Sequence, residues 1–210
     1  DPVRFLGNKS SGRQGLAVAA AAARAGASVR VIAANIDESV MAALPSGVEV
    51  TRVGSACEMR EAAMAQVIGA DALVMTAAVA DFRPEAAQAS KMKKDPTKTD
   101  APTLRLVRNP DILSEVGHSD IRPALVVGFA AETGTDEEIL ANGADKAARK
   151  GADYIALNRV GAGVGFGDVP NDIRLLDVGG QIVGRYIGSK DEVAAGLVAQ
   201  MAAFLDNLER

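Results

Sequence analysis

The fold is decided by residues 3–33, which read VRFLGNKSSGRQGLAVAAAAARAGASVRVIA. The apolar run Val3–Gly7 predicts a strand, and the Gly/Ser-rich turn after it leads into an alanine-rich helix from about Gly12 to Ala25. Val29–Ala33 predicts a second strand. A strand, a helix and a strand in this order form a βαβ unit, in which the two strands run parallel and the crossover is right-handed.

The same alternation of strands and helices continues along the chain. The apolar and helical patterns predict, in order, a helix at Glu38–Leu44, a strand at Val48–Val53, a helix at Met59–Ile68, strands at Ala72–Thr76 and Thr103–Val107, a helix opening near Pro110, a strand at Leu125–Ala130, a helix at Asp136–Lys150, a strand at Tyr154–Leu157, a hairpin of Ile173–Asp177 with Gln181–Ile187, and a helix at Lys190–Leu208. In the hairpin, Gly179 and Gly180 permit the positive φ of a tight primed turn. We therefore expect an α/β fold with a Rossmann-like, doubly wound, mostly parallel sheet and a C-terminal β-hairpin and helix.

Composition indicates one ordered domain over residues 1–210. The chain has 210 residues, 48% of them hydrophobic and 24% charged, and its formal net charge is −4. This balance excludes disorder and argues against binding to nucleic acid or to an anionic membrane, because both need a basic surface. The longest apolar run, Leu16–Ala23, is too short to span a bilayer. We expect a cytoplasmic protein.

The single cysteine and the single histidine carry no site of their own. Cys57 has no second cysteine for an internal disulfide, and with His118 it is too little for a structural zinc site. We expect structural roles for both and no metal cage built by protein side chains. The absence of an initiating methionine before Asp1 suggests a piece of a longer chain.

The turn between the first predicted strand and helix is a candidate phosphate site. Backbone N–H groups at a helix N-terminus attract anions, and Gly12 and Gly15 let a phosphate approach the backbone. Ser10 and Ser11 add hydroxyl donors. The alternative is that the glycines only let the helix pack closely on the sheet.

This turn departs from the usual nucleotide-binding motifs. A dinucleotide site would have glycine where Ser10 stands and an acid at the end of the second strand, which instead runs through Ala33, Ala34 and Asn35. The glycine and lysine spacing of a P-loop is also absent. A nicotinamide-dependent reductase is therefore disfavoured but stays open.

A second signal lies after the predicted strand Ala72–Thr76, where the sequence reads AAVADFR from Ala77 to Arg83. Ligands of open α/β sheets bind at the carboxyl ends of strands, so Asp81 is either a ligand of a ribose or metal-bound phosphate, or the cap of a turn. Residues 81–102 predict a long loop whose lysines form a cationic flap. These lysines are Lys91, Lys93, Lys94 and Lys98.

Two further signals follow predicted strands. Asn109-Pro110-Asp111-Ile112 opens a helix, with Asn109 expected as its N-cap and Pro110 at the first helical position. Phe129, in the run GFAAET from Gly128 to Thr133, lies at a strand end, where it either packs in the core or flanks a base. Lys146 and Lys150 lie four residues apart on one face of a helix.

Taken together these segments resemble phosphopantothenoylcysteine synthetase, the CTP-dependent ligase that forms the C-terminal domain of a bacterial bifunctional decarboxylase/synthetase. The motifs are, in order, DPVR, NxSSGxxG, AAVAD[FY]R, KxKK, NPDI and GFAAET, and they span the chain from Asp1. The resemblance implies that the carboxylate of 4'-phosphopantothenate attacks CTP to give an acyl cytidylate and pyrophosphate. The amine of L-cysteine then displaces CMP.

The resemblance also assigns roles to residues. It implies catalytic roles for Asn8, which would hold the acyl cytidylate, and for Lys91, which would close on the nucleotide. CTP contacts are implied at Ala77, Asp81, Lys91, Asn109, Pro110, Asp111, Ile112, Phe129, Lys146 and Lys150, to which the anion-site argument adds Ser10, Ser11, Gly12 and Gly15.

The resemblance implies partners and cofactors as well. Mg²⁺ or Mn²⁺ would be bound mainly through the triphosphate. FMN would belong only to a decarboxylase domain fused upstream. A homodimer is expected, with Arg4 near the partner chain.

The sequence departs from the family at two places. Arg13-Gln14 stands where lysine and methionine are commoner, and Asn158-Arg159 where asparagine and aspartate are. The second departure leaves residues 158–171 without an assignment. Besides the nicotinamide-dependent reductase, a non-catalytic nucleotide-binding module stays open.

Overall fold

The computed structural model describes residues 1–93, 101–159 and 171–208. Its helices are α1 (Arg13–Arg24), α2 (Glu38–Met41), α3 (Ala56–Gln66), α4 (Ile112–Gly117), α5 (Asp136–Lys150) and α6 (Lys190–Leu208). Its strands are β1 (Arg30–Ala34), β2 (Glu49–Val53), β3 (Ala72–Met75), β4 (Phe82–Pro84), β5 (Leu106–Arg108), β6 (Leu125–Glu132), β7 (Tyr154–Arg159), β8 (Asn171–Asp177) and β9 (Ile182–Gly188).

The central sheet has the strand order β3-β6-β7-β8-β9. The first three strands run parallel, and the C-terminal hairpin β8–β9 adds two antiparallel neighbours. β1 and β2 pair with each other in parallel but form a separate two-stranded sheet. The Rossmann-like α/β class with a C-terminal hairpin and helix is confirmed, although hydrogen bonds divide the described strands among three sheets, of which β4 and β5 form the third.

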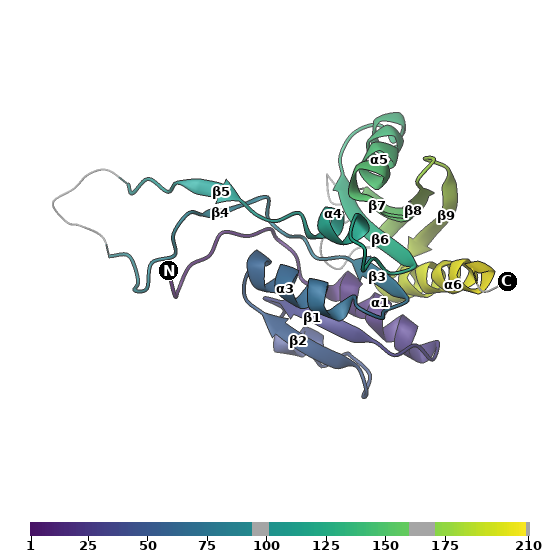
Figure 1. The fold of residues 1–210 in the computed structure, drawn as a ribbon, viewed down its shortest axis with the longest axis horizontal. Helices are drawn as coiled ribbons and strands as arrows, with labels where there is room; N and C mark the ends of the chain where they lie inside the picture. The colour runs from purple at the N-terminus through teal and green to yellow at the C-terminus, as the bar shows by residue number, and fades with distance from the viewer. Residues whose placement is uncertain (94–100, 160–170, 209–210) are drawn as a thin grey trace.

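Helices cover both faces of the central sheet, as Figure 1 shows. Along β6, Leu125 and Val127 face one core with α1 and α6, whereas Val126 and Ala130 face another with α4 and α5. Successive strand side chains point to opposite faces, so a strand buried on both sides reads as a continuous apolar run. Both faces of β6 are thus covered, and the carboxyl ends of the parallel strands are where open α/β sheets bind ligands.

The helices α5 and α6 match their predicted bounds because both carry local end signals. Thr135 and Glu138 form a capping box at the start of α5, and Gly151 ends that helix in the left-handed conformation at φ 61°. At the start of α6, the Glu192 carboxylate accepts hydrogen bonds from the backbone N–H and hydroxyl of Ser189. Such signals fix helix ends without tertiary contacts.

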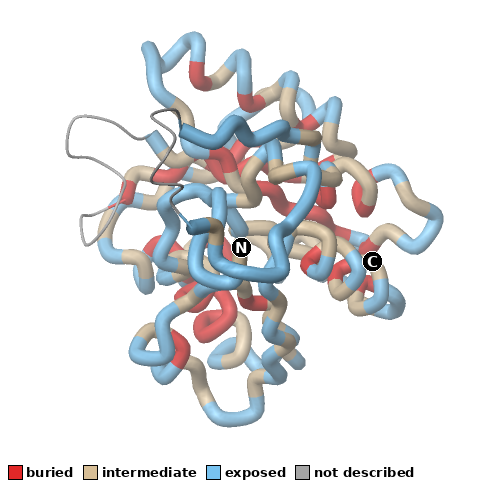
Figure 2. Tube along the Cα trace, turned by 90° about the vertical axis from the view of Figure 1, so that its left-hand side faces the viewer, coloured by how far each residue is buried: buried red, intermediate tan, exposed pale blue. Residues whose placement is uncertain are grey.

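The strand expected at Val3–Gly7 is wrong. Residues 1–11 form no strand and run along an extended arm, where Phe5 is 78% exposed and Val3 and Leu6 are also exposed. The Asp1 carboxylate accepts backbone hydrogen bonds from Val3 and Arg4 at 3.0 and 2.9 Å. These bonds hold a turn instead of a ladder. Figure 2 shows this segment pale blue after Asp1.

The region expected as a loop at residues 81–102 also differs from the prediction. β4 pairs antiparallel with β5, and together they form the arm that projects from the body in Figure 1. Lys94 and Lys98 lie outside the described residues. Three residues make so short a strand that its pattern cannot be read from the sequence, because only the partner strand defines it.

Two local predictions need correction. The N-cap of α4 is Asp111, whose side chain accepts from the backbone N–H of Ser114, and not Asn109. In the β8–β9 turn only Gly180 has a positive φ, at 78°, and Gly180 N–H donates to Asp177 O at 3.0 Å. A connection over residues 178–181 with a left-handed Gly180 therefore replaces the expected primed turn.

Candidate functional site

The candidate site lies at the carboxyl end of β3, in residues 76–81. This segment lies between the start of α1 and the segment that leads into α4. Gly15 packs against Thr76, so closely that a Cβ at Gly15 would overlap the threonine hydroxyl. The Asn8 amide donates to the Val79 carbonyl at 3.3 Å. The glycine turn and the segment after β3 are therefore neighbours, as ligand binding at strand ends requires.

Asn109 joins the second and third motifs. Its side-chain Nδ2 donates to Ala80 O at 2.7 Å, and its backbone N–H donates to Asp81 O at 2.8 Å. Arg83 in turn donates to Asn109 Oδ1 at 3.2 Å. This network fixes the backbone at Ala80 and Asp81 and leaves the side chain of Asp81 exposed. Asn109 is thus a structural link of the site, whereas the sequence predicted a helix cap.

The start of α1 offers backbone donors to an anion. Its N-cap is Gly12 at φ 74°, and no side chain caps the helix. A Cβ at Gly12 would approach Ile36, which follows β1. The N–H groups of the first turn therefore have no capping side chain and lie beside the ends of β1 and β3. Ser10 and Ser11 are exposed at this turn.

The two predicted lysines of α5 both carry carboxylate partners. Lys146 Nζ lies 2.7 Å from Glu132 Oε1, at the end of β6, and their side chains are 29% and 17% exposed. Lys150 pairs with Asp111, the N-cap of α4. Because helix side chains point toward the helix N-terminus, both ammonium groups reach from α5 toward the carboxyl end of the sheet. Glu132 ends β6, and this position could have identified it from the sequence.

Phe129 and Lys91 are placed differently from these residues. Phe129 is half-buried and packs against the core that β6 shares with α1 and α6. Of the two alternatives for this residue, core packing is the one observed. Lys91 is exposed and precedes Met92, whose backbone N–H donates to Asp1 at the N-terminus. Figure 1 shows the N-terminus on the arm, away from α1 and β3. The structure therefore does not bring Lys91 to the other predicted site residues.

The arm is anchored by the DPVR motif, a contact that sequence reasoning missed. Met92 N–H donates to Asp1 Oδ2 at 3.2 Å, and Arg4 Nη2 donates to Met92 O at 3.0 Å. Arg4 and Asp1 also form an ion pair, in which the Asp1 side chain is only 2% exposed. Both backbone groups of the residue after Lys91 are thereby held.

The two departures from the family pattern have structural partners. Gln14 Oε1 accepts from Asn171 Nδ2 at 2.6 Å, and Asn171 also approaches Lys190 at the start of α6. Arg159 pairs with Asp136 at 3.2 Å. Residues 160–170, between Arg159 and Asn171, lie outside the described part of the chain.

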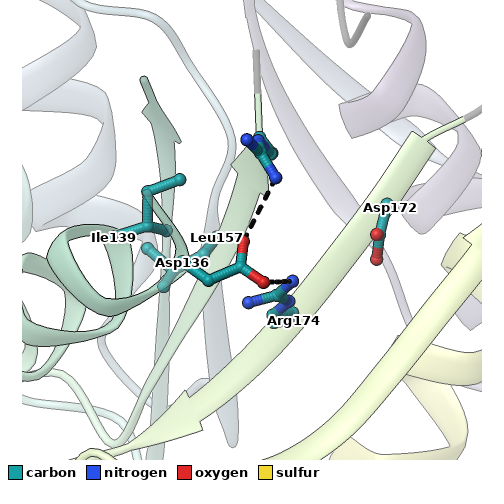
Figure 3. A pocket seen from close by; sticks show the side chains of 6 residues that line it. Asp136, Ile139, Leu157, Asp172 and Arg174 are labelled. Atoms are coloured by element: carbon teal, nitrogen blue, oxygen red, sulfur yellow. Dashed lines mark hydrogen bonds and ion pairs between the residues drawn. The ribbon is translucent and has the colours of Figure 1, made fainter. Parts of the chain in front are cut away.

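A charged cluster around Asp136 encloses a small cavity, shown in Figure 3. Asp136 lies between Arg159 and Arg174, at 3.2 and 2.7 Å, and Asp172 pairs with Arg185 at 2.7 Å. The hydrogen bond from Arg174 holds the pKa of Asp136 below its usual value, and Arg185 does the same for the pKa of Asp172. The cavity holds about 10 Å³, which admits roughly one water and no nucleotide.

The single cysteine and the single histidine lie outside the candidate site. Cys57 is half-buried in the first turn of α3, and His118 is exposed at the end of α4. Within residues 1–93, 101–159 and 171–208, no three histidine, cysteine or acidic side chains gather as metal ligands. No helix in this described part is both long and apolar enough to cross a membrane.

Comparison with known proteins finds relatives that carry the same name, CoaBC. The chain is 41% identical over 211 aligned residues to the coenzyme A biosynthesis bifunctional protein CoaBC of Mycolicibacterium smegmatis, covering 98% of this chain and 50% of that protein. It is 43% identical over 183 residues to the CoaBC protein of Vibrio parahaemolyticus, covering 87% of this chain and 44% of that protein. The chain thus spans about half the length of these curated relatives.

Solved structures agree on the fold. The crystal structure of the C-terminal domain of a CoaBC protein superposes with a TM-score of 0.75 at 28% identity, covering 99% of this chain and 89% of that one. A Cab2 H337A mutant in complex with phosphopantothenate-cysteine superposes with a TM-score of 0.67 at 14% identity, covering 99% and 83% of the two chains. At that identity the second likeness shows the fold alone.

The family follows from a match over almost the whole chain. Residues 1–205 match the DNA/pantothenate metabolism flavoprotein C-terminal domain, which confirms the resemblance that the motifs predicted. The chain therefore belongs to the DNA/pantothenate metabolism flavoprotein C-terminal domain family.

Proposed function

We propose that this chain is a phosphopantothenate–cysteine ligase of coenzyme A biosynthesis that uses CTP. The observation that carries the proposal is the convergence at the end of β3, where Asn8 and Asn109 both donate to the backbone of residues 79–80. The bifunctional CoaBC relatives support the pathway, and the named phosphopantothenate-cysteine ligand of Cab2 supports the product class.

The nucleotide would occupy the edge formed by the start of α1, residues 77–81 and residues 109–112. Backbone N–H groups at the uncapped start of α1 suit a phosphate, with the Ser10 and Ser11 hydroxyls beside them. An ammonium group has three donors, so Lys146 and Lys150 can contact phosphate oxygens and keep their carboxylate partners. Phe129 would contribute through the shape of the edge, because its ring packs in the core.

The first half-reaction forms an acyl cytidylate. A carboxylate oxygen of 4'-phosphopantothenate attacks the α-phosphorus of CTP, and the bond to the β-phosphate breaks to release pyrophosphate. Negative charge develops on the transferring group, and fixed donors there lower the barrier most. Asn8 would donate its amide to this group, and Lys91 would bring a positive charge when the arm approaches.

The second half-reaction forms the amide bond. The amine of free L-cysteine attacks the acyl carbon, the C–N bond forms, CMP leaves with the oxygen, and the nitrogen loses a proton. Cys57 takes no part, because it lies half-buried in α3.

A divalent cation fits the edge through a single carboxylate. Asp81 is exposed after β3, and Mg²⁺ is commonly held by one or two carboxylates together with substrate phosphates. When bound, Mg²⁺ or Mn²⁺ would screen the triphosphate and help pyrophosphate to leave. Asp81 would hold the ion or a ribose hydroxyl.

We propose that the chain forms a homodimer, and the exposed apolar side chains of the arm support this proposal. Several large apolar side chains of the arm are exposed, and exposed apolar patches of this kind mark association surfaces. They are Val3, Phe5, Leu6, Phe82, Leu104 and Leu106. A second copy would cover these side chains, with Arg4 at the contact. Lys91 on the arm of one copy would then approach the nucleotide site of the other copy. We also propose a decarboxylase domain fused upstream, to which FMN would belong, and a cytoplasmic location. The bifunctional name of the CoaBC relatives, of which this chain covers about half, supports a further domain.

The test is turnover with defined substrates. The purified chain is incubated with 4'-phosphopantothenate, CTP and Mg²⁺, with and without L-cysteine, and products are followed by mass spectrometry. The proposal expects the cysteine amide with cysteine, the acyl cytidylate without it, and pyrophosphate in both. CTP binding without turnover would favour a nucleotide-binding module. No CTP binding together with tight NADPH binding by calorimetry would favour a reductase.

A further inference from the structure

The C-terminal ends of α4 and α5 touch backbone to backbone at two glycines. A Cβ at Gly117 would overlap the carbonyl oxygen of Lys150, and a Cβ at Gly151 would lie 2.7 Å from the carbonyl oxygen of Gly117. Gly117 is buried and Gly151 adopts φ 61° as the cap of α5. No other residue type fits this contact without moving one helix against the other.

The backbone and the ammonium group of Lys150 contact opposite ends of α4. Its backbone lies against Gly117, the last residue of α4, while its ammonium pairs with Asp111, the N-cap of the same helix. The helix has six residues and is about 9 Å long, a span that the lysine and aspartate side chains cover together. The ion pair therefore links the backbone of Lys150, at the last residue of α4, to the N-cap of the same helix.

Both ends of Lys150 are thus fixed by different groups. Asp111 holds the ammonium while its other oxygen accepts from Ser114 N–H at 3.2 Å, so the carboxylate itself is oriented by the helix start. The glycine contact sets the distance between the backbone of Lys150 and α4. If α5 moved outward, the ammonium would withdraw from Asp111 and from the edge beside residues 109–112.

We infer that Gly117 and Gly151 are positioning residues that set the reach of the Lys150 ammonium toward the nucleotide. The inference rests on the proposed CTP-dependent function and adds two residues that lie in none of the sequence motifs. A shift of about 1 Å is enough to lose much of a charge-assisted contact, because such contacts depend on distance and direction.

Gly151→Ala tests the inference with Gly69→Ala as its matched control. Both glycines have positive φ, 61° and 71°, so both substitutions carry the same kind of backbone strain. Only at Gly151 does the new Cβ meet another element, because nothing lies within 4 Å of the Cβ position at Gly69. Gly117→Ala is the stronger variant, and if it does not fold, Gly151→Ala carries the test alone.

CTP affinity is measured by calorimetry with CTP and Mg²⁺ on the folded variants. We expect Gly151→Ala to bind CTP about tenfold more weakly than wild type, and Gly69→Ala to bind within about twofold. In a Lys150→Met background, adding Gly151→Ala should change the affinity by less than about twofold, since the lysine through which it acts is gone.

Two results would overturn the inference alone, and a third would also overturn the proposed function. Unchanged CTP affinity in Gly151→Ala, or a tenfold loss that persists in the Lys150→Met background, overturns the positioning role alone. Wild-type protein that binds no CTP overturns the proposed function and this inference together, so the two failures are distinguishable.

Discussion

The side-chain amide of Asn109 donates to the carbonyl of Ala80 at 2.7 Å, and it thereby ties the start of the α4 segment to the segment after β3. The two residues are 29 positions apart in the chain, and this hydrogen bond joins the two sequence motifs that contain them. Asn109 is half-buried, so its polar atoms have few partners other than these backbone groups.

Asn109→Ala should weaken both the fold and CTP binding. The change removes the donor to Ala80 and the acceptor of Arg83, and leaving such groups unpaired costs about 1–3 kcal/mol. Thermal unfolding and CTP titration measure the two effects. Asn142→Ala, at an exposed position of α5, is the control and should change neither. An Asn109→Ala protein as stable as wild type would contradict the linking role.

Lys91→Gln should abolish most turnover while the fold is kept. Lys91 is exposed on the arm, so its loss leaves packing intact but removes the charge proposed to reach the transferring phosphate. Lys93→Gln, equally exposed two residues later, is the matched control and should retain turnover. Equal activity in the two variants would remove Lys91 from the mechanism.

Asn8→Asp should also fold normally and turn over slowly. The substitution keeps the size of the side chain but replaces the amide donor to Val79 with a negative carboxylate. Repulsion between this charge and the phosphates should reduce kcat by about 100-fold or more. Steady-state kinetics measure the effect, and a wild-type rate would reject Asn8 as a catalytic residue.

Lys146→Met should raise the Kd for CTP by about 10- to 100-fold, the loss of one charge-assisted contact. The control lies one residue earlier on the same helix. Asp145→Asn removes an exposed ion pair with Arg149, whose side chains are 58% and 64% exposed, and should leave CTP affinity unchanged. If Asp145→Asn weakened CTP binding as much as Lys146→Met, the effect would belong to the helix and not to the lysine.

Asp136→Asn should destabilise the protein at neutral pH and have less effect in acid. The hydrogen bond from Arg174 lowers the pKa of Asp136, so the unfolded chain binds this proton more readily than the folded one. The stabilisation is therefore complete above the ordinary pKa of an aspartate, about 4, and is lost as the pH falls through the lowered pKa.

The Tm of wild type and Asp136→Asn is measured from about pH 7 to about pH 3. We expect the gap between them to shrink below about pH 4, whereas Asp206→Asn on the last turn of α6 should show no gap. A Tm gap between wild type and Asp136→Asn that stays constant across this range would contradict the assignment.

What the sequence by itself determined are the features with local causes. The bounds of α5 follow from the capping box at Thr135 and the left-handed Gly151, and the order of strands and helices follows from apolar periodicity. The motifs also identified the family, and they placed Asp81 and Asn109 near strand ends, because the carboxyl ends of parallel strands share one edge.

The tertiary structure alone decided which surfaces and charges meet. Val3–Gly7 has the composition of a strand, but it lies on an arm beside Met92, because hydrogen bonds to Asp1 and Arg4 hold it there. Likewise no local pattern pairs Lys150 with Asp111 or brings Gly117 against Gly151. Each of these contacts joins residues distant in the chain, so its energy depends on how whole elements pack and not on neighbouring residues.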